Sequence, residues 1–342
     1  MIERPTVIVL GAGASTEFGL PTGVGLANDI AVRAAFYFTD GVQTGGDPDL
    51  YNAFNSDPQF RDRLFLAGRL ISRGLPMARS VDDFLYNHDE DKLVLDLGKA
   101  AIVQSILAAE RDSYLFEAFS QNQDDPEQIF DRIAHTWQYH LFSFMHVGVK
   151  RSDIANVFRN LSIINFNYDR CVEELFPYLL NRAYGVSIEE GRDATQATLD
   201  ITHVYGRVGN LPWHGQGQTA PYVNFGSCVT GKSLRQLSSG IRTFTEQAQD
   251  PDEIEHCRSI LGAAEQVIFL GFGFHRQNMA LLSLDSPRWN TALATGYKVS
   301  LADQSVFKRR VMEMFKNSDL NVEVANITAN DLIRNYGLRI AG

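Results

Sequence analysis

A short apolar run that turns directly into glycines constrains the fold of this 342-residue chain more than any other feature. Residues 6–10 read TVIVL, which predicts a strand buried on both faces. Five small residues follow at once: Gly11, Ala12, Gly13, Ala14 and Ser15. A strand that turns sharply into a helix presents free backbone N–H groups, and glycines let a phosphate approach them closely. The segment therefore predicts a cradle for the pyrophosphate of a dinucleotide.

A tight turn with no ligand is the competing interpretation of two glycines alone. A second glycine-bearing segment, residues 19–23 with Gly19 and Thr22, makes this interpretation weaker because extra glycines are costly in a purely structural helix start. Thr16 stands where the third glycine of G-x-G-x-x-G belongs, which disfavours a hydride-transfer Rossmann site. The turn therefore predicts a dinucleotide bound in a role other than hydride transfer.

Further short apolar runs predict a sheet around the first strand. These predicted strands are residues 162–166, 201–205, 267–270, 298–301 and 322–324. Helical spacing of apolar residues follows several of them, as in residues 169–180. Buried strands that alternate with helices predict an α/β fold with a doubly wound, mostly parallel, Rossmann-like sheet.

Two long insertions interrupt this pattern. Residues 27–159 show helical patterns, notably at 92–119 and 126–147, and predict a large embedded helical subdomain with a polar loop at 40–49. The Rossmann-like domain then comprises residues 1–26 and 160–342. Within it, residues 209–265 predict a glycine-rich loop followed by two helices.

Composition narrows the possible environments and partners. The net charge of −10 disfavours direct binding to nucleic acid, which is itself anionic. The sequence has no run of 18 apolar residues and opens without a signal-peptide pattern, so we expect a cytoplasmic protein that does not span a membrane. We expect no metal site, because the three cysteines contain no C-x-x-C pair: Cys171, Cys228 and Cys257.

The glycine segment resembles the NAD-binding motif of the sirtuin superfamily, G-A-G-x-S-x-x-x-G-[IL]-P, over residues 11–21. Residues 165–169 (NFNYD) are similar to the family's T-x-N-x-D, so Asn167 and Asp169 match its two functional positions. The threonine position holds Asn165.

A third match follows the predicted strand at 267–270. It resembles the glycine-bearing loop that holds the cofactor, and it comprises Gly271, Phe272 and Gly273. Thr22-Gly23, Asn278 and residues 80–85 look like the bacterial sirtuin-like branch. The resemblance covers the sheet-forming segments, which are under half of the chain, and the zinc module of the deacetylases is missing.

The catalytic histidine of sirtuins stands directly before a glycine, and here Tyr205 takes that position before Gly206. His203 lies two residues earlier. Residues two apart on a strand share a face, so His203 is expected to point toward the same site, about 6–7 Å further back at ~3.3 Å per residue.

The resemblance implies a site that cleaves the nicotinamide–ribose bond of NAD+. Asn167 would hold the ribose or the attacking water, and Asp169 would contact the nicotinamide carboxamide. His203 would act as general base or orient a ribose hydroxyl, and Tyr205 is the less favoured candidate for this role. Tyr205 is also expected to contact the cofactor. The competing interpretations are that Asn167 and Asp169 only cap a helix and that His203 only packs in the core.

The acceptor decides the activity. Water as acceptor gives an NAD+ glycohydrolase that releases nicotinamide and ADP-ribose, and bacterial proteins of this kind are similar to antiphage effectors that deplete NAD+. The alternatives are a module that binds NAD+ or ADP-ribose and signals through a partner, and a protein deacylase. The family analogy implies a homo-oligomer or a second defence-system subunit as partner.

Overall fold

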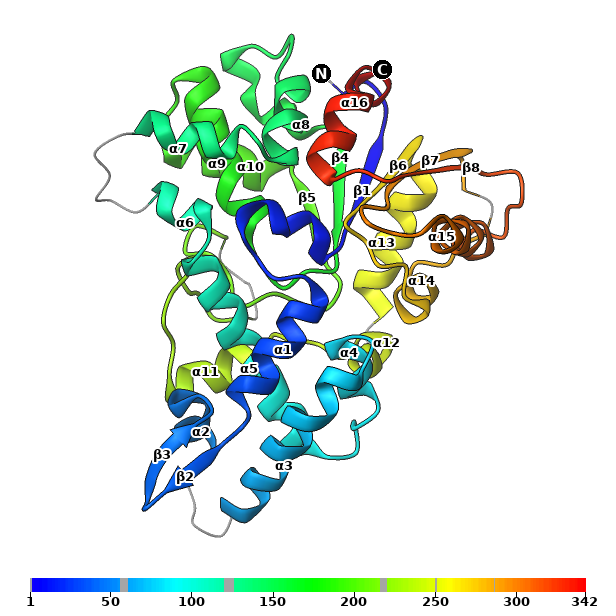
Figure 1. Ribbon diagram of the computed structural model, residues 1–342. Helices are drawn as coiled ribbons and strands as arrows, with labels where there is room; N and C mark the ends of the chain where they lie inside the picture. Colours follow the sequence, from blue (N-terminus) through cyan, green and yellow to red (C-terminus); the bar gives the residue numbers. More distant parts are fainter. Residues whose placement is uncertain (1, 56–60, 120–125, 216–219, 250, 286) are drawn as a thin grey trace.

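The protein is described by a computed structural model that covers residues 2–55, 61–119, 126–215, 220–249, 251–285 and 287–342 (Figure 1). Six parallel strands form one sheet in the order β5-β4-β1-β6-β7-β8. Their bounds are β1 Thr6–Leu10, β4 Leu161–Asn165, β5 Asp200–His203, β6 Gln266–Leu270, β7 Thr291–Thr295 and β8 Asn321–Ala325. The predicted α/β class with a doubly wound parallel sheet is confirmed.

The order in which the chain adds strands to the sheet reverses at β1. From β1 the chain passes outward through β4 to β5, then returns to β6 on the other side of β1 and continues to β7 and β8. β1 and β6 pair in step from Thr6↔Gln266 to Leu10↔Leu270, so both strands end at the same level. Ligands of open α/β sheets bind outside the carboxyl ends of the strands at such a reversal.

Alternate residues of the strands build two hydrophobic clusters, one on each face of the sheet. Val7 and Val9 of β1 belong to the first cluster, and Ile8 and Leu10 belong to the second. The first cluster also takes residues from α1 Gly23–Arg33, α3 Arg61–Gly74, α5 Lys92–Arg111, α11 Gly231–Ser238, α13 Pro251–Ala263 and α15 Leu301–Met314, and it extends beyond the sheet to α3 and α11 at the lower end of the molecule. The second face is covered by the 3-10 helices η1 Ala12–Phe18 and η4 Arg151–Phe158, and by α8 Trp137–Met145, α9 Cys171–Tyr184, α10 Ile188–Thr198 and α16 Ala329–Ala341.

Shorter elements complete the described chain. They are α2 Pro48–Phe54, η3 Leu75–Met77, α4 Val81–Tyr86, α6 Tyr114–Phe119, α7 Pro126–Ile133, α12 Phe244–Gln249, α14 Arg276–Leu281 and the hairpin strands β2 Tyr37–Thr39 and β3 Val42–Gly45. The hairpin occupies part of the segment predicted as a polar loop at 40–49. Figure 1 shows it at the lower end of the molecule, far from the six-stranded sheet.

One predicted strand is wrong and another was missed. Residues 298–301 form a turn, because Lys298 has φ 59° and the Ser300 hydroxyl accepts a hydrogen bond from Asp303 N at the start of α15. The fifth strand in the sequence is instead β7, whose sequence TALAT has no large β-branched residue. β5 ends at His203, two residues before the predicted end.

Polar caps divide the two longest predicted helices. Residues 92–119 separate into α5 and α6, where the Ser113 hydroxyl accepts a hydrogen bond from Phe116 N. Residues 126–147 separate into α7 and α8, where the Thr136 hydroxyl accepts one from Tyr139 N. A hydroxyl that satisfies a free N–H at a helix start favours a new helix over a continuous one.

The helical subdomain at 27–159 stays a prediction as a separate unit. Its α5 packs in the cluster on one face of the sheet, whereas its α8 packs in the cluster on the other. The described residues of the predicted insertion at 209–265 form three helices rather than the two expected, and α11 packs against α5 and α2.

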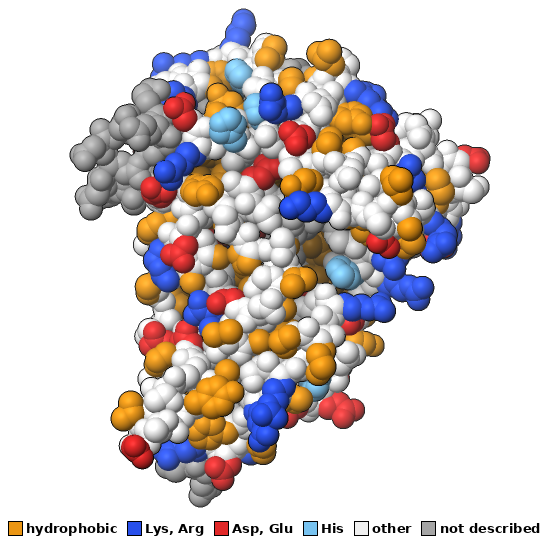
Figure 2. Space-filling model, in the orientation of Figure 1, with side chains coloured by type: hydrophobic (Ala, Val, Ile, Leu, Met, Phe, Trp, Pro, Cys, Tyr) orange, Lys and Arg blue, Asp and Glu red, His pale blue; other side chains and the backbone are white. Residues whose placement is uncertain are grey.

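The visible face of the molecule carries both charges and exposed hydrophobic side chains. Figure 2 shows hydrophobic side chains gathering over the lower part of the molecule and a hollow near the centre of the face, beside η1. Exposed apolar residues of the lower elements include Val32, Val42 and Leu66. No helix in the described ranges is long and apolar enough to cross a membrane.

Candidate functional site

The turns after β1 and β6 are packed directly on each other. Gly13 N donates a hydrogen bond to the Gly271 carbonyl oxygen at 3.1 Å. A Cβ on Gly11 would lie 2.6 Å from that same oxygen, and a Cβ on Gly13 would lie 2.8 Å from Gly271 Cα. Gly271 itself has φ 59°. Glycine is therefore required at all three positions for the contact between the two turns.

This contact gives Gly11 and Gly13 a second role besides the predicted binding of a phosphate. The close approach that Gly11 and Gly13 allow is made by the chain's own backbone, a role that the sequence did not indicate. The turn continues as η1, which ends at Gly19 with φ 90°. Gly19 and Gly273 are exposed, Ala12 is half-buried, and Ala14 is buried.

Two other predicted cofactor contacts have structural roles in addition. The Thr22 hydroxyl accepts a hydrogen bond from Gly25 N and so caps α1. Phe272 is buried, with its ring centroid 5.0 Å from that of Phe166. Thr22 itself is exposed and lies at the start of the helix after η1.

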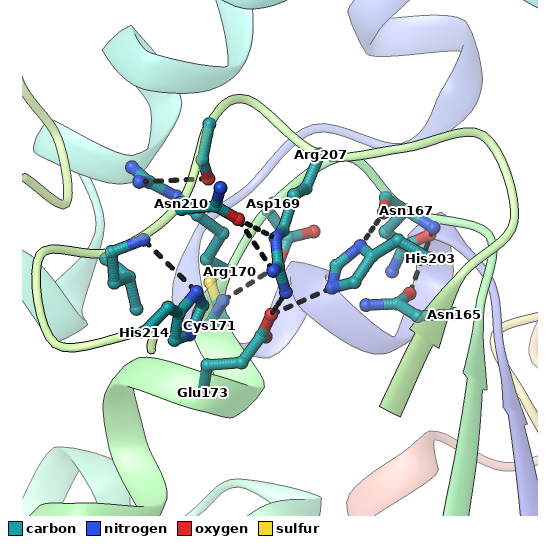
Figure 3. A network of polar contacts seen from close by, with 12 residues as sticks. Asn165, Asn167, Asp169, Arg170, Cys171, Glu173, His203, Arg207, Asn210 and His214 are labelled. Atoms are coloured by element: carbon teal, nitrogen blue, oxygen red, sulfur yellow. Dashed lines mark hydrogen bonds and ion pairs between the residues drawn. The ribbon is translucent and has the colours of Figure 1, made fainter. Parts of the chain in front are cut away.

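Three side chains from the β1 and β4 turns meet in one hydrogen-bonded group, the Ser15–Asn167–Asp169 set. The Ser15 hydroxyl donates to Asp169 Oδ2 at 2.8 Å. Asn167 Nδ2 donates to the Gly11 carbonyl oxygen and to Ser15 Oγ, each at 3.1 Å. Asn165 Oδ1 accepts from Asn167 N at 2.9 Å and so shapes the turn after β4 (Figure 3). The structure thus brings together residues predicted from separate motifs.

Asp169 combines a capping role with a perturbed carboxyl group. Its Oδ1 accepts a hydrogen bond from Cys171 N at the start of α9, as the capping interpretation expects. Burial raises the pKa of this carboxyl, and the hydrogen bonds from Ser15 and Cys171 offset only part of that rise. The charge of His203 also lowers this pKa, but burial outweighs it, so the carboxyl is held closer to its neutral form than a surface aspartate.

His203 lies behind Asn167 with both ring nitrogens engaged. Its Nδ1 is 2.9 Å from the Asn167 carbonyl oxygen, and its Nε2 is 2.9 Å from Glu173 Oε1 (Figure 3). A carbonyl oxygen and an ionised carboxylate both accept hydrogen bonds, so each ring nitrogen faces an acceptor of the protein. In this geometry neither nitrogen is free to remove a proton from a ligand.

Glu173 is the anion that holds this arrangement together. Burial raises the pKa of its carboxyl, but the charge and hydrogen bond of His203 and the charge of Arg207 outweigh burial and lower that pKa overall. Arg207 Nη1 lies 3.3 Å from Glu173 Oε1, and Arg207 also donates to Asn210 Oδ1 at 2.7 and 3.0 Å. We call His203, Glu173, Arg207 and Asn210 the Glu173 network.

The network opens on a cavity at the outer edge of the sheet. His203, Arg207 and Asn210 line this space of about 390 Å³ next to β5. No member of the Ser15–Asn167–Asp169 set lines it.

Tyr205, which holds the sirtuin histidine position, points elsewhere. Its hydroxyl donates to Asn278 Oδ1 at 2.7 Å, and its buried ring meets Phe166 edge to face at 5.8 Å. Burial raises the pKa of the phenol, which therefore keeps its proton. The expected shared face with His203 is wrong because β5 ends at His203 and strand alternation stops there.

A second buried ion pair lies directly beyond Asp169 and escaped the sequence analysis. Arg170 Nη2 is 2.5 Å from Glu110 Oε2, and both side chains are fully buried. Arg170 Nη1 also donates to the Val223 carbonyl oxygen at 2.7 Å, and Glu110 Oε2 accepts from Gly226 N at 3.0 Å. The pair ties α5, the start of α9 and the 223–226 loop together. No local pattern indicates a partner 60 residues away.

Comparisons with known proteins place few constraints on the chain. No protein-family model matches it, and no curated protein matches it. Among the described residues no group of three His, Cys, Asp or Glu side chains is arranged to hold a metal ion. One similar solved structure is a mutant of a Sir2 homologue in complex with 2'-O-acetyl ADP ribose. That similarity covers 99% of this chain and 93% of the other chain, with 11% identity and a TM-score of 0.36, values too low to assign the chain to a family.

Proposed function

We propose that this chain binds NAD+ at the carboxyl edge of the sheet and cleaves its nicotinamide–ribose bond with water as acceptor. One observation carries the proposal. Ser15, Asn167 and Asp169 come from turns more than 150 residues apart and form one hydrogen-bonded set where the sheet reverses direction. This is the position at which open α/β sheets bind nucleotides.

The chemistry of the set suits this bond. Nicotinamide leaves NAD+ as a neutral molecule from a cationic ring, so the reaction needs a positioned acceptor and stabilised positive charge more than a strong acid. The Asn167 amide donates and accepts at once, which fits a ribose hydroxyl or a water molecule. The Asp169 carboxyl, with its raised pKa, is suited to contact the nicotinamide carboxamide.

Access is consistent with this placement. The hollow in Figure 2 adjoins η1, and the exposed edge of the turn includes Thr16, Gly19 and Thr22. Ala12 and Ser15 are the proposed contacts for the pyrophosphate, together with the Gly271–Gly273 loop, whereas Gly13 N already donates to the Gly271 carbonyl oxygen. Free backbone N–H groups at the start of a helix would bind an anion.

A second candidate is NAD+ or ADP-ribose binding without turnover. It is favoured by the engagement of both ring nitrogens of His203 and by the retained proton of Tyr205. In that arrangement neither side chain is free to act as a general base. The base role of His203 is a proposal that substitution of this residue tests.

The test incubates the full-length protein with NAD+ and follows nicotinamide and ADP-ribose by chromatography. Release of both products by the wild type, lost in Asn167→Ala, would support the hydrolase. Saturable NAD+ binding by calorimetry with no release would support the binding module. Release that depends on an added acyl-lysine peptide would point to a deacylase, and neither binding nor release would overturn the proposal.

The biological role that we propose is bacterial antiphage defence by NAD+ depletion in the cytoplasm, with a homo-oligomer or a second subunit controlling activity. It rests on the sirtuin-like motifs alone. The test measures cellular NAD+ during phage infection of cells that express the wild type or Asn167→Ala. Equal NAD+ levels and equal phage yields in the two would remove this role and leave the enzymatic proposal untouched.

A further inference from the structure

A second pocket lies beside α9, and no member of the Ser15–Asn167–Asp169 set lines it. Its volume is about 410 Å³, and Phe116, Trp213 and Phe225 supply three aromatic side chains to its lining. Glu174 of α9 and Arg192 of α10 add one carboxyl and one guanidinium. Small-molecule pockets in proteins are mostly apolar and aromatic, with a few polar groups that fix orientation.

Two of the aromatic residues that line the pocket, Phe225 and Trp213, pack against neighbouring side chains of the protein. Phe225 packs against the guanidinium of the buried Arg170, which lies 5.8 Å from the ring centroid. The Trp213 ring meets His214 edge to face at 4.5 Å. The Gln196 amide donates to the Trp213 carbonyl oxygen at 3.1 Å and accepts from Gly215 N at 2.6 Å. These contacts hold the backbone on both sides of His214 beside the pocket.

The charged groups of the pocket also interact with the protein and with each other. Arg192 Nε is buried within the protein, and the Arg192 side chain hydrogen-bonds Tyr178. The charge of Arg192 also acts on the Glu174 carboxyl. Burial raises the pKa of Glu174 to about 7, so this carboxyl can change protonation state near neutral pH.

We propose that this pocket binds a purine nucleobase, with guanine as the best match. Three aromatic side chains offer stacking partners for a planar base. Arginine pairs with the O6 and N7 acceptors of guanine, and a carboxylate accepts from its N1–H and N2–H2 donors. Pyrimidines lack the N7 acceptor and have a smaller stacking area. The base is carried by a free nucleoside or by a dinucleotide, and the two are separated below.

Trp213 supplies a direct signal for the test. The protein has three tryptophans, and the other two, Trp137 and Trp289, are 0% and 2% exposed. Guanosine is titrated into the full-length protein with excitation above the absorption of the base, and tryptophan emission is followed. We expect saturable quenching by guanosine, weaker quenching by adenosine and none by uridine. Trp213→Phe should abolish the signal, whereas calorimetry still detects binding.

Two variants test the polar contacts. Arg192→Met and Glu174→Gln should each weaken guanosine binding about tenfold or more, because each removes a charge-assisted hydrogen bond. Asp193→Asn, on the exposed side of α10, is the matched control and should bind like the wild type. Because Glu174 and Arg192 are only partly buried, both variants are expected to fold, and circular dichroism checks this.

The outcomes decide both the site and the source of the base. A guanine dinucleotide that quenches Trp213 at lower concentration than guanosine, in a manner weakened by Glu174→Gln, would support the pocket and identify a dinucleotide as the carrier. No saturable quenching by either purine, equal binding of uridine, or unchanged binding in both polar variants would overturn the proposal. Because the readout is binding at Trp213, the result is independent of nicotinamide release.

Discussion

Two polar groups lie on opposite sides of the same residue, and their carboxyls behave in opposite ways. Asn167 contributes its side chain to the Ser15–Asn167–Asp169 set and its carbonyl oxygen to the Glu173 network. Both carboxyls are almost fully buried. Burial dominates at Asp169 and raises its pKa, whereas His203 and Arg207 outweigh burial at Glu173 and lower its pKa.

The difference shows how one turn serves two purposes. The Glu173 carboxyl lies between His203 and Arg207, which contact its Oε1, and it holds the His203 ring against the Asn167 carbonyl oxygen. A buried carboxyl with only neutral donors remains available for a ligand that brings its own charge or hydrogen bonds. We therefore assign the Glu173 network to support of the turn and the Ser15–Asn167–Asp169 set to the proposed chemistry.

The largest expected effect comes from breaking the supporting network. Glu173→Ala leaves His203 and Arg207 without their anion, and it should lower the free energy of unfolding by about 3–5 kcal/mol. Urea denaturation measures this. The matched control is Glu174→Ala, one residue along α9, whose half-buried side chain should cost much less. Equal losses in the two variants would contradict the comparison.

The next effect falls on the proposed chemistry. Asn167→Ala removes the amide that positions ribose or water, and nicotinamide release should fall about 10²–10³-fold. Chromatography of the reaction products gives the rates. Asn321→Ala, at the exposed start of β8, is the control and should leave the rate unchanged. A rate near that of the wild type in Asn167→Ala would remove this residue from the reaction.

A smaller effect is expected at His203. If its ring supports Asn167 rather than removing a proton, His203→Gln should reduce nicotinamide release by no more than about tenfold, since glutamine keeps one of the two hydrogen bonds. The pH–rate profile should keep its shape. A loss of about a thousandfold or more, together with disappearance of an ionisation from the profile, would instead make His203 the general base.

The smallest expected effect is the difference between Glu173 and Asp169 in how their ionisation changes the free energy of unfolding with pH. The pKa of Glu173 is lower in the folded protein than its ordinary value of 4.5, so its contribution is fully present above pH 4.5 and is lost as the pH falls below it. The pKa of Asp169 is raised above 3.8, so its contribution is present below that pH and is lost as the pH rises through the folded value.

Unfolding by urea at a series of pH values separates the two. Glu173→Gln should remove part of the fall in stability on the acid side, and Asp169→Asn should remove part of the fall as pH rises from about 4. The same pH slope in both variants and the wild type would show that neither carboxyl differs between the folded and unfolded states.

The sequence by itself determined β1, the turn that follows it and two polar residues of the candidate site. The apolar run at 6–10 and the small residues after it specify β1 and its turn, because burial and backbone freedom are properties of single residues and near neighbours. Asn167 and Asp169 were found because both follow a buried strand. β7 was missed because TALAT has weak strand propensity and is stabilised by pairing with β6 and β8.

Only the tertiary structure decided how these segments meet. It placed Gly271 against Gly11 and Gly13, so that glycines predicted to face a phosphate also allow two turns to touch. It also brought Glu173 to His203, which left that ring with no free nitrogen. Such contacts join residues distant in the chain, and the protonation of a buried group depends on every charge around it. No local pattern carries that information.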